Sequence, residues 1–270
     1  MDYTFQEIQT LSRIGSRGVF GKALAELTEN YPELRVVAAD VMSSARLEEF
    51  TQKASARFIN VGIAEQNMIG ISAGLASEGY TVVATSFAPF ATMRCFEMIR
   101  SQIGYMNLNV KIVGLLSGVA GGALGNTHYG LEDIAIMRTI PNMTVLSPAD
   151  GVETYKTIQA ALAHQGPVYI RLSGSNGFPV VYKEDYEFTI GKGILLRKGE
   201  DIAIIATGTM VSEAIRAARA LAKEKISVSV IDMHTIKPLD TDILDQVFKK
   251  HKLVVTIEEH FCIGGLGSAV

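Results

Sequence analysis

The sequence has no apolar run long enough to cross a bilayer and it has little cysteine, and these absences exclude several classes of protein. Its opening residues, MDYTFQEIQT, carry acids early and lack the apolar core of a signal peptide. The 2 cysteines, Cys95 and Cys262, have no CxxC spacing, so we expect buried thiols in a reducing compartment rather than a disulfide. The cytoplasm is therefore the expected location.

An excess of basic residues is also absent. The 270 residues include 25 lysines and arginines against 28 aspartates and glutamates, so electrostatics gives no reason to expect a nucleic acid or an anionic membrane as partner. The histidines show no metal-ligand spacing, so we expect no metal site built by this chain alone. The composition, with 48% hydrophobic and 20% charged residues, is that of a soluble globular protein.

Strand-like and helix-like segments alternate along most of the chain. Because the apolar runs lack polar alternation, they predict strands that are buried on both faces of a parallel sheet, and hence an α/β fold. Asp150 and Gly166 are suited to start and stop one of the intervening helices, and Pro89 fits the first turn of another. The predicted strands are LRVVAAD, RFINVGI, TVVATS, VKIVGLLS, MTVLSP and PVYIRLS, and the predicted helices are EQNMIGISAGLASEG, PFATMRCFEMIRSQI and ADGVETYKTIQAALAHQG.

A stretch rich in glycine, proline and charge, GSNGFPVVYKEDYEF, interrupts this pattern. A smaller parallel α/β unit is predicted after it, with strands DIAIIATG, SVSVID and LVVTIEE and helices VSEAIRAARALAKE and DTDILDQVFKKHK. We therefore predict a first domain at 1–182, a linker at 183–195 and a second domain at 196–270. Because the sequence stops just after a strand and a glycine-rich turn, we expect the second domain to be incomplete.

Glu65 is placed where a predicted strand ends and a helix begins, in FINVGIAEQNM. In α/β folds the carboxyl edge of the sheet is where ligands bind. A carboxylate at that edge can exchange a proton with a basic nitrogen of a ligand. Alternatively, it can simply complement the dipole of its own helix.

Two further motifs point to the same edge of the sheet. Phe87 and Phe90, in TSFAPF, either belong to the core or stack against a flat heteroaromatic ring. His128 lies in the segment 117–130, whose five glycines let the backbone approach a ligand closely but fit neither a P-loop nor a dinucleotide fingerprint. Its imidazole suits proton transfer or a hydrogen bond to a substrate oxygen, although a lone histidine can also be structural.

Taken together, VGIAEQNMIGISAGLASEG, TSFAPF, the glycine-rich segment ending in THYG, IPNMTVLSPAD and GPVYIRLS resemble the pyrimidine-binding domain of transketolase. The chain from about residue 190 onward resembles the start of the transketolase C-terminal domain. Full-length transketolases begin with a diphosphate-binding domain that carries a GDG…N metal motif, and neither is present in this sequence. The chain therefore resembles the C-terminal subunit of a split, two-polypeptide transketolase.

This resemblance implies thiamine diphosphate and Mg²⁺ as cofactors, with the metal and the diphosphate held by a partner subunit. Glu65 matches the family glutamate that hydrogen-bonds the aminopyrimidine ring. Phe87 and Phe90 match the aromatic wall around that ring, and Asp40 matches an acid near the cofactor and the dimer interface. His128 matches the histidine that contacts the donor substrate. Glu65 and His128 would be the catalytic residues, in a heterotetramer with two copies of each subunit.

The implied reaction is the transfer of a two-carbon ketol unit from a ketose phosphate to an aldose phosphate, as in the pentose phosphate pathway. Arg17 and Ser44 are found where the family places contacts to the substrate phosphate, and both are suitable donors.

Some positions depart from the family pattern. Leu116 and Leu124 replace a histidine and an aspartate that transketolases often carry. Gly174 replaces an arginine that often binds phosphate, although Arg171 is three residues away. These departures concern the sugar-phosphate substrate rather than the cofactor.

Other interpretations of the same motifs are open. A deoxyxylulose-phosphate synthase uses the same cofactor, but that family usually has arginine in place of Phe90 and is normally one long chain. The β subunit of a 2-oxoacid dehydrogenase would also be a separate polypeptide with a glutamate at this site. A non-catalytic scaffold is a further alternative, against which the retention of Glu65 and both phenylalanines argues.

Overall fold

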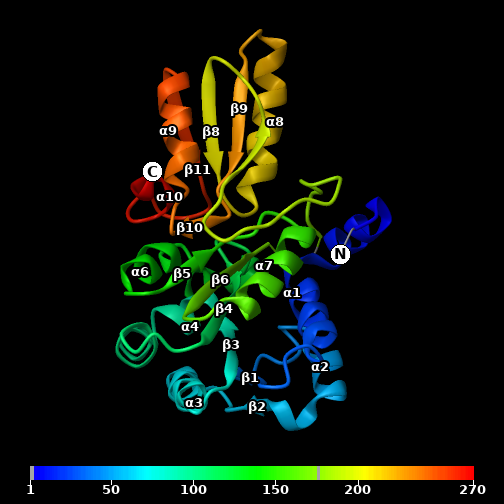
Figure 1. Ribbon diagram of the computed structural model, residues 1–270, viewed down its shortest axis with the longest axis vertical. Coiled ribbons are helices and arrows are strands. Elements are labelled where there is room, and N and C mark those ends of the chain that lie inside the picture. Colours follow the sequence, from blue (N-terminus) through cyan, green and yellow to red (C-terminus); the bar gives the residue numbers. More distant parts are fainter. Residues whose placement is uncertain (1–2, 175–176) are drawn as a thin grey trace.

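The protein was analysed as a computed structural model that describes residues 3–174 and 177–270. Ser175 and Asn176, in the stretch rich in glycine, proline and charge, lie outside the described residues. The described chain forms two sheets with helices on both faces of each, and the larger sheet is built mainly from the first part of the chain (Figure 1). None of the described helices is long and apolar enough to cross a membrane.

The large sheet has 7 strands in the order β10-β5-β6-β4-β3-β1-β2. All its pairs are parallel except that between β10 and β5, which is antiparallel. Each of the six predicted runs contains one strand, so the predicted parallel α/β sheet is confirmed. The six strands are β1 (Leu34–Ala38), β2 (Phe58–Asn60), β3 (Thr81–Phe87), β4 (Val110–Ser117), β5 (Thr144–Leu146) and β6 (Val168–Ser173).

One strand prediction was wrong in its burial. The run RFINVGI was expected to be buried on both faces, but β2 is a 3-residue strand at the edge of the sheet, with Phe58 and Ile59 only half-buried. An edge strand has one neighbour, so apolar residues there are covered less completely than in the centre of the sheet. The apolar run alone does not distinguish these two positions.

Helices cover both faces of the large sheet, as expected for a doubly wound fold. The apolar residues of α1, α2 and α7 pack on one face, and those of α3, α6 and the segment from α4 to η2 pack on the other. Asp150 caps α7 as predicted, because its carboxylate accepts the backbone N–H of Glu153 at 2.9 Å. These helices are α1 (Phe5–Leu27), α2 (Glu48–Lys53), α3 (Glu65–Ser77), α4 (Ala88–Thr92), α5 (Phe96–Met98), the π-helix η2 (Ile99–Gly104), α6 (Asp133–Thr139) and α7 (Gly151–Ala163).

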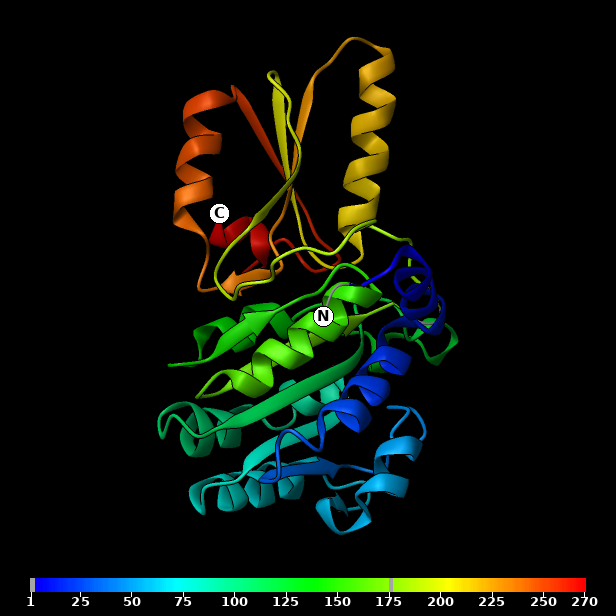
Figure 2. The ribbon, with the colours of Figure 1, turned by 45° about the vertical axis from the view of Figure 1, so that its right-hand side comes forward.

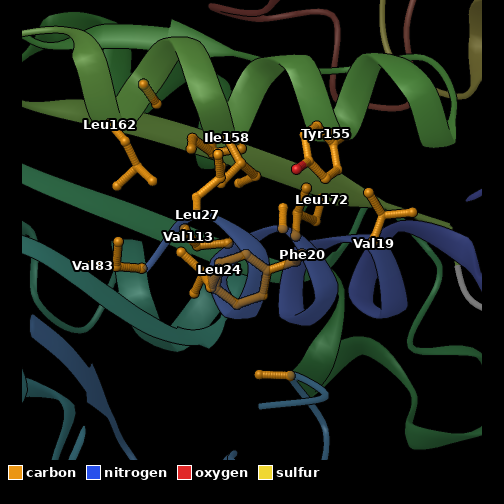
Figure 3. Packing of buried hydrophobic residues seen from close by; sticks show 14 of the residues in the cluster. Val19, Phe20, Leu24, Leu27, Val83, Val113, Tyr155, Ile158, Leu162 and Leu172 are labelled. Carbon is orange, nitrogen blue, oxygen red and sulfur yellow. The ribbon is translucent and has the colours of Figure 1, made fainter. Parts of the chain in front are cut away.

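The first helix, α1, was not predicted from the sequence. It runs for 23 residues in two arms that meet at Gly15, whose φ of 71° interrupts the helical backbone. Its second arm packs against α7 over the centres of β3, β4 and β6 (Figure 3). The buried side chains that meet there are Val19, Phe20, Leu24, Leu27, Val83, Val113, Tyr155, Ile158, Leu162 and Leu172.

The small sheet has 4 strands in the order β11-β8-β9-β7, and α8 and α9 lie on opposite sides of it (Figures 1 and 2). The predicted strands and helices of this unit are present, but β7 was missed and runs antiparallel to β9. The prediction of an all-parallel unit was therefore wrong at this edge. The elements are β7 (Ile194–Arg197), β8 (Ile202–Ala206), α8 (Met210–Lys223), β9 (Val228–Asp232), α9 (Thr241–Lys250), β11 (Leu253–Ile257) and α10 (Leu266–Ala269).

The two sheets are joined by β10 (Thr235–Lys237), which leaves the small-sheet unit and pairs with β5. The Lys237 ammonium strengthens this junction, since it donates to the carbonyl of Arg138 at 3.0 Å. The second part of the chain thus supplies β10 as an edge strand of the large sheet. The sequence did not predict this strand.

Candidate active site

Glu65 is the first residue of α3 and its side chain is buried, with 4% of its surface exposed. Its carboxylate Oε2 accepts a hydrogen bond of 2.8 Å from Nη1 of Arg94. Arg94 lies between α4 and α5, where the predicted helix PFATMRCFEMIRSQI is broken into three pieces. The carbonyl of Arg94 accepts from the Gln66 side chain at 3.2 Å instead of continuing the helical ladder. The break therefore directs Arg94 toward the start of α3.

Phe87, Phe90 and His128 form an aromatic cluster in which all three rings meet edge to face. The ring centroids are 6.1 Å apart for Phe87 and Phe90, 5.6 Å for Phe87 and His128, and 5.1 Å for Phe90 and His128. Phe87 ends β3, Phe90 is in α4, and His128 follows the neighbouring strand β4, so the carboxyl edge of the sheet gathers them as predicted.

Arg94 connects this aromatic cluster to Glu65. Its guanidinium carbon lies 4.3 Å from the ring centroid of Phe90 while Nη1 donates to the Glu65 carboxylate. A planar group that donates hydrogen bonds therefore already fits between a buried carboxylate and an aromatic face. An aminopyrimidine ring has the same requirements, so the residues present suit such a ligand.

Cys95 lies directly behind this site and is buried, and its thiol donates to the carbonyl of Phe90 at 3.3 Å. Burial, reinforced by the charge of Glu65, raises the pKa of the Cys95 thiol to about 12. The thiol is therefore protonated at neutral pH and helps to hold α4 rather than acting as a nucleophile. Cys262 is exposed, so the expectation that both thiols are buried was wrong for this residue.

His128 is presented by a closed loop between β4 and α6. Gly118 and Gly130 pair across the base of the loop, with N–H to carbonyl distances of 2.8 and 2.9 Å. Within the loop, the Tyr129 hydroxyl donates to the carbonyl of Gly122 at 3.1 Å. Nδ1 of His128 lies 3.0 Å from the hydroxyl of Thr127. The predicted glycine-rich segment thus folds on itself and carries the imidazole to the aromatic cluster.

Asp40 is not part of the contacts that join Glu65 to the aromatic cluster. It follows β1 with an exposed side chain and a φ of 57°, and its backbone N–H donates to Oδ1 of Asn60 at 3.1 Å. A positive φ at a residue other than glycine is uncommon and is often found at functional sites.

Arg17 and Ser44 are brought together by the fold, because Nη1 of Arg17 donates to the carbonyl of Ser44 at 3.1 Å. Burial, and then the neighbouring charge of Arg46, lower the pKa of Arg17. Its Nε is buried without a hydrogen-bond partner among the described residues. The fold therefore places the two residues side by side, with the Nε of Arg17 turned away from solvent.

Arg171, three residues before Gly174, is not available to a substrate. It is fully buried and its Nε donates to the Asp133 carboxylate at 2.9 Å. Its Nη2 donates to the carbonyls of Gly130 at 3.0 Å and Glu259 at 2.7 Å. Arg171 therefore forms a buried ion pair with Asp133 and supports the base of the glycine-rich loop.

Three buried carboxyl groups lie where the segment before β7 crosses α7 and β9. Asp150 accepts the N–H groups of Val181 and Tyr182 at 2.9 and 3.1 Å, and Tyr182 donates to Asp232 at 2.7 Å. Burial raises the pKa of Asp232 to about 7, and burial together with the charges of Asp232 and Asp150 raises the pKa of Glu153 well above its usual range. This buried acid cluster fixes the connecting segment to both sheets.

Sequence reasoning missed Arg94 and Glu259. For the segment Glu258-Glu259-His260, which ends a predicted strand, the sequence leaves both a solvated turn and an inter-domain turn open. Glu259 accepts the backbone N–H of Val119 in the glycine-rich loop at 3.1 Å, which agrees with the inter-domain alternative. Neither residue lies in a motif, and each acts on a segment distant in the sequence. Nothing in the sequence pointed to the role of Arg94. For Glu259, its position as a charged residue just after a predicted strand was the only sign of a function.

Fold and site together define a doubly wound α/β protein with a candidate ligand site at the carboxyl edge of its large sheet. The chain matches the model of the transketolase pyrimidine binding domain over residues 12–178 and that of the transketolase C-terminal domain over 191–270. It belongs to the transketolase family, whose members include transferases.

Within that family the chain is similar to proteins that are separate C-terminal sections or subunits. A putative transketolase C-terminal section of Methanocaldococcus jannaschii is 45% identical over 95% of this chain and 80% of the relative. A 6-deoxy-6-sulfo-D-fructose transketolase subunit of Clostridium sp. is 41% identical over 94% of this chain and 78% of the relative. A solved structure described as a split gene transketolase, inactive beta4 tetramer, superimposes with a TM-score of 0.87 at 43% identity, covering 95% of this chain and 83% of that one.

Proposed function

We propose that this chain is the pyrimidine-binding subunit of a thiamine-diphosphate-dependent transketolase and is active only with a partner that carries the diphosphate-binding domain. The observation that carries the proposal is the buried Glu65 carboxylate beside the aromatic cluster, at the carboxyl edge of a parallel sheet. The similarity to separate transketolase subunits supports the same division of labour. When bound, the cofactor would supply a carbon nucleophile that cleaves a ketose next to its carbonyl group.

Glu65 would share a proton with a ring nitrogen of the pyrimidine: its protonated carboxyl group would donate to the neutral nitrogen, and its carboxylate would accept from the nitrogen once the proton has moved. Its burial favours this role, since a carboxylate out of water makes a stronger hydrogen bond to its partner. Arg94 donates a hydrogen bond to the same carboxylate, so Arg94 would have to release Glu65 or share it with the pyrimidine ring.

Phe87 and Phe90 would form the wall of the pyrimidine site and exclude water from it. His128, from the glycine-rich loop, would hydrogen-bond a hydroxyl or carbonyl oxygen of the donor substrate and exchange a proton with it. Asp40 would lie near the cofactor, on the surface that a second chain covers. In this proposal Glu65 and His128 are the catalytic residues.

The proposed substrates are a ketose phosphate as donor and an aldose or aldose phosphate as acceptor. Arg17 and Ser44 are the proposed contacts to the phosphate, and the hydrogen bond from Nη1 of Arg17 to the Ser44 carbonyl supports that role because it brings the two residues together. Arg171 cannot contribute because its side chain is buried and its Nε and Nη2 donate to Asp133 and to two backbone carbonyls. The name of the Clostridium relative indicates that other anionic sugars should be tested as well.

The partner subunit would hold Mg²⁺ and the diphosphate, and two copies of each subunit would form a heterotetramer with the active site between chains. The same proposal includes a first domain at 1–182, a linker at 183–195 and a second domain at 196–270. It also includes a cytoplasmic location and a place in the pentose phosphate pathway. The family-model matches at 12–178 and 191–270 support the division.

The test is a titration of thiamine diphosphate and Mg²⁺ into this chain, alone and mixed with the candidate diphosphate-domain subunit, followed by a ketol-transfer assay with xylulose 5-phosphate. Binding and turnover in the mixture alone are the expected results. Binding without ketol transfer would move the substrate search to 2-oxoacids and unphosphorylated sugars. Absence of binding in both samples would contradict the proposal.

A further inference from the structure

Glu259 belongs to the small-sheet unit, directly beyond β11, but its side chain reaches the loop that carries His128. Its Oε1 accepts the backbone N–H of Val119 at 3.1 Å. Its Oε2 accepts from the hydroxyl of Thr209, at the start of α8, at 3.3 Å. The carboxylate therefore ties the beginning of the glycine-rich loop to the small-sheet unit.

The backbone around this contact is shaped for the close approach of the carboxylate. Gly118 has a φ of 71°, and a Cβ atom at this position would lie 2.3 Å from the carboxyl carbon of Glu259. No other residue type could occupy position 118 without displacing Glu259. The carbonyl of Glu259 is also fixed, because it accepts from the buried Arg171 at 2.7 Å.

The residues after Glu259 continue to contact the far end of the same loop and α6. The N–H of Phe261 donates to the carbonyl of Leu131 at 3.0 Å, and Nε2 of His260 accepts the N–H of Ala135 at 3.3 Å. Arg138 donates to the carbonyl of Gly265 at 3.0 Å. These hydrogen bonds fix the turn after β11 against α6 and the end of the glycine-rich loop. The backbone of Glu259 is therefore held in place, which restricts the positions that its side chain can take.

A change at Val119 can reach His128 through a short chain of hydrogen bonds. The carbonyl of Val119 accepts the N–H of Gly122 at 3.0 Å, and the carbonyl of Gly122 accepts both the N–H of Gly125 and the Tyr129 hydroxyl. The carbonyl of Gly125 then accepts the N–H of His128 at 3.0 Å. Glycine-rich backbone has few side-chain contacts to restrain it, so its conformation depends on such pinned points.

We propose that Glu259 is a positioning residue, by which the small-sheet unit holds the glycine-rich loop in the conformation that places His128 against Phe87 and Phe90. The loop conformation is a claim about this chain alone, whereas its effect on the donor substrate rests on the proposed function. The small-sheet unit thereby gains a role in the candidate active site without contributing a catalytic residue.

The test compares Glu259→Ala and Glu259→Asp with Glu258→Ala as the matched control. Glu258 is the adjacent acid, but it accepts the N–H of Gly267 at 2.9 Å and so serves α10 instead of the loop. Amide hydrogen exchange at Val119 and the ring proton resonances of His128 are measured in the intact chain. The chain has only 5 histidines, so a His128→Gln sample assigns those resonances.

In Glu259→Ala, exchange at Val119 should become about tenfold faster or more, since a hydrogen bond to a charged acceptor is lost. The His128 resonances should move toward those of an exposed histidine. Glu259→Asp keeps the charge, but its side chain is too short to reach both Val119 and Thr209. Changes in exchange and in the resonances between those of wild type and Glu259→Ala are therefore expected. If Glu259→Ala does not fold, Glu259→Asp alone tests the proposal. Glu258→Ala should leave Val119 and His128 unchanged. Unaltered exchange and resonances in both Glu259 variants would overturn the proposal.

The assembled enzyme separates the loop effect from the proposed function. With the partner subunit present, Glu259→Ala should lower kcat/KM for the donor about tenfold and leave the Kd for thiamine diphosphate within about twofold of wild type. An equal loss of cofactor affinity would mean that Glu259 supports the whole site and not the loop, and would overturn the proposal. If the wild-type assembly shows no ketol transfer, the proposed function fails, and exchange at Val119 with the His128 resonances still decides the role of Glu259.

Discussion

Arg94 donates a hydrogen bond of 2.8 Å to Glu65 from a segment 29 residues further along the chain, across a break in a helix. The same guanidinium covers one face of Phe90. Arg94 therefore makes both contacts that a planar, hydrogen-bond-donating ligand would make between Glu65 and Phe90.

Replacing Arg94 with alanine should lower the free energy of unfolding of the free chain by about 1–2 kcal/mol, because a buried carboxylate loses its partner while the other side of the pair is already half-exposed. In the assembly saturated with cofactor the loss should be smaller, since the pyrimidine supplies Glu65 with a new partner. Thermal unfolding with and without partner and thiamine diphosphate measures both values. Arg100→Ala, which removes a surface pair with Glu97, is the control. Equal losses for the two arginine variants would contradict the assigned role of Arg94.

Glu65→Gln should reduce turnover of the reconstituted enzyme by at least about 100-fold, because an amide keeps the shape of the side chain but cannot exchange a proton with the ring nitrogen. The isolated variant should still fold, with a circular dichroism spectrum like that of wild type. Glu97→Gln changes a nearby exposed carboxylate in the same way and should leave turnover unaltered. A normal rate in Glu65→Gln would refute the catalytic assignment.

Phe90→Ala should weaken binding of thiamine diphosphate to the assembly by a factor of about 2–13, the equivalent of the 0.5–1.5 kcal/mol that an aromatic pair contributes. Calorimetric titration gives the Kd directly. Phe248→Ala, at a half-exposed phenylalanine of α9, controls for the general cost of losing a surface ring. An unchanged Kd in Phe90→Ala would remove the ring from the cofactor wall.

The sequence predicted the parallel sheet and the central site because both depend on local patterns. The runs around β3 and β4 are apolar without alternation, and the carboxyl ends of neighbouring parallel strands must meet at one edge. The sequence alone therefore predicts that Phe87 and His128 lie close together. Arg94 could not, because the same apolar spacing that predicted one helix from Pro89 onward gives no sign of the break.

Other elements escaped prediction for a related reason. The strand β10 is three residues long and contains lysine, so it has no apolar run, and only its pairing with β5 makes it a strand. The sequence could not decide whether Glu259 is solvated or lies between the domains, because its partners, Val119 and Thr209, are 140 and 50 positions away. Arg171 lies near the expected phosphate site in sequence, but the strand turns its side chain inward to Asp133. Contacts of this range are decided by tertiary packing and leave no local pattern.

His128→Gln should slow cleavage of the donor substrate while leaving the affinity for thiamine diphosphate near that of wild type. An amide can still pack against Phe90, but it cannot transfer a proton, so a rate loss of about 100-fold is expected. Single-turnover kinetics with excess enzyme separates donor cleavage from later steps. His164→Gln, at the histidine that follows the C-terminus of α7, is the matched control. A variant that lost cofactor affinity but kept its rate of cleavage would place His128 in the cofactor site instead.

Asp232→Asn should stabilise the protein more at pH 8 than at pH 5. Burial raises the pKa of Asp232 from 3.8 to about 7, so the folded chain binds a proton that the unfolded chain has released between these values. The stability that depends on this proton is complete below about pH 4 and is lost as the pH rises to about 7. Asparagine carries no charge at either pH and its amide oxygen can still accept from Tyr182.

Urea unfolding at pH 5 and pH 8 tests this expectation, with the shift in midpoint relative to wild type as the readout. Asp245→Asn, at an exposed aspartate of α9, should give the same small shift at both pH values. A midpoint difference for Asp232→Asn that does not grow with pH would mean that Asp232 is ionised in the folded chain throughout this range. The proton of the acid cluster would then reside on Glu153, whose pKa is raised by burial and by the neighbouring carboxylates, and Glu153→Gln would be the variant in which the pH dependence changes.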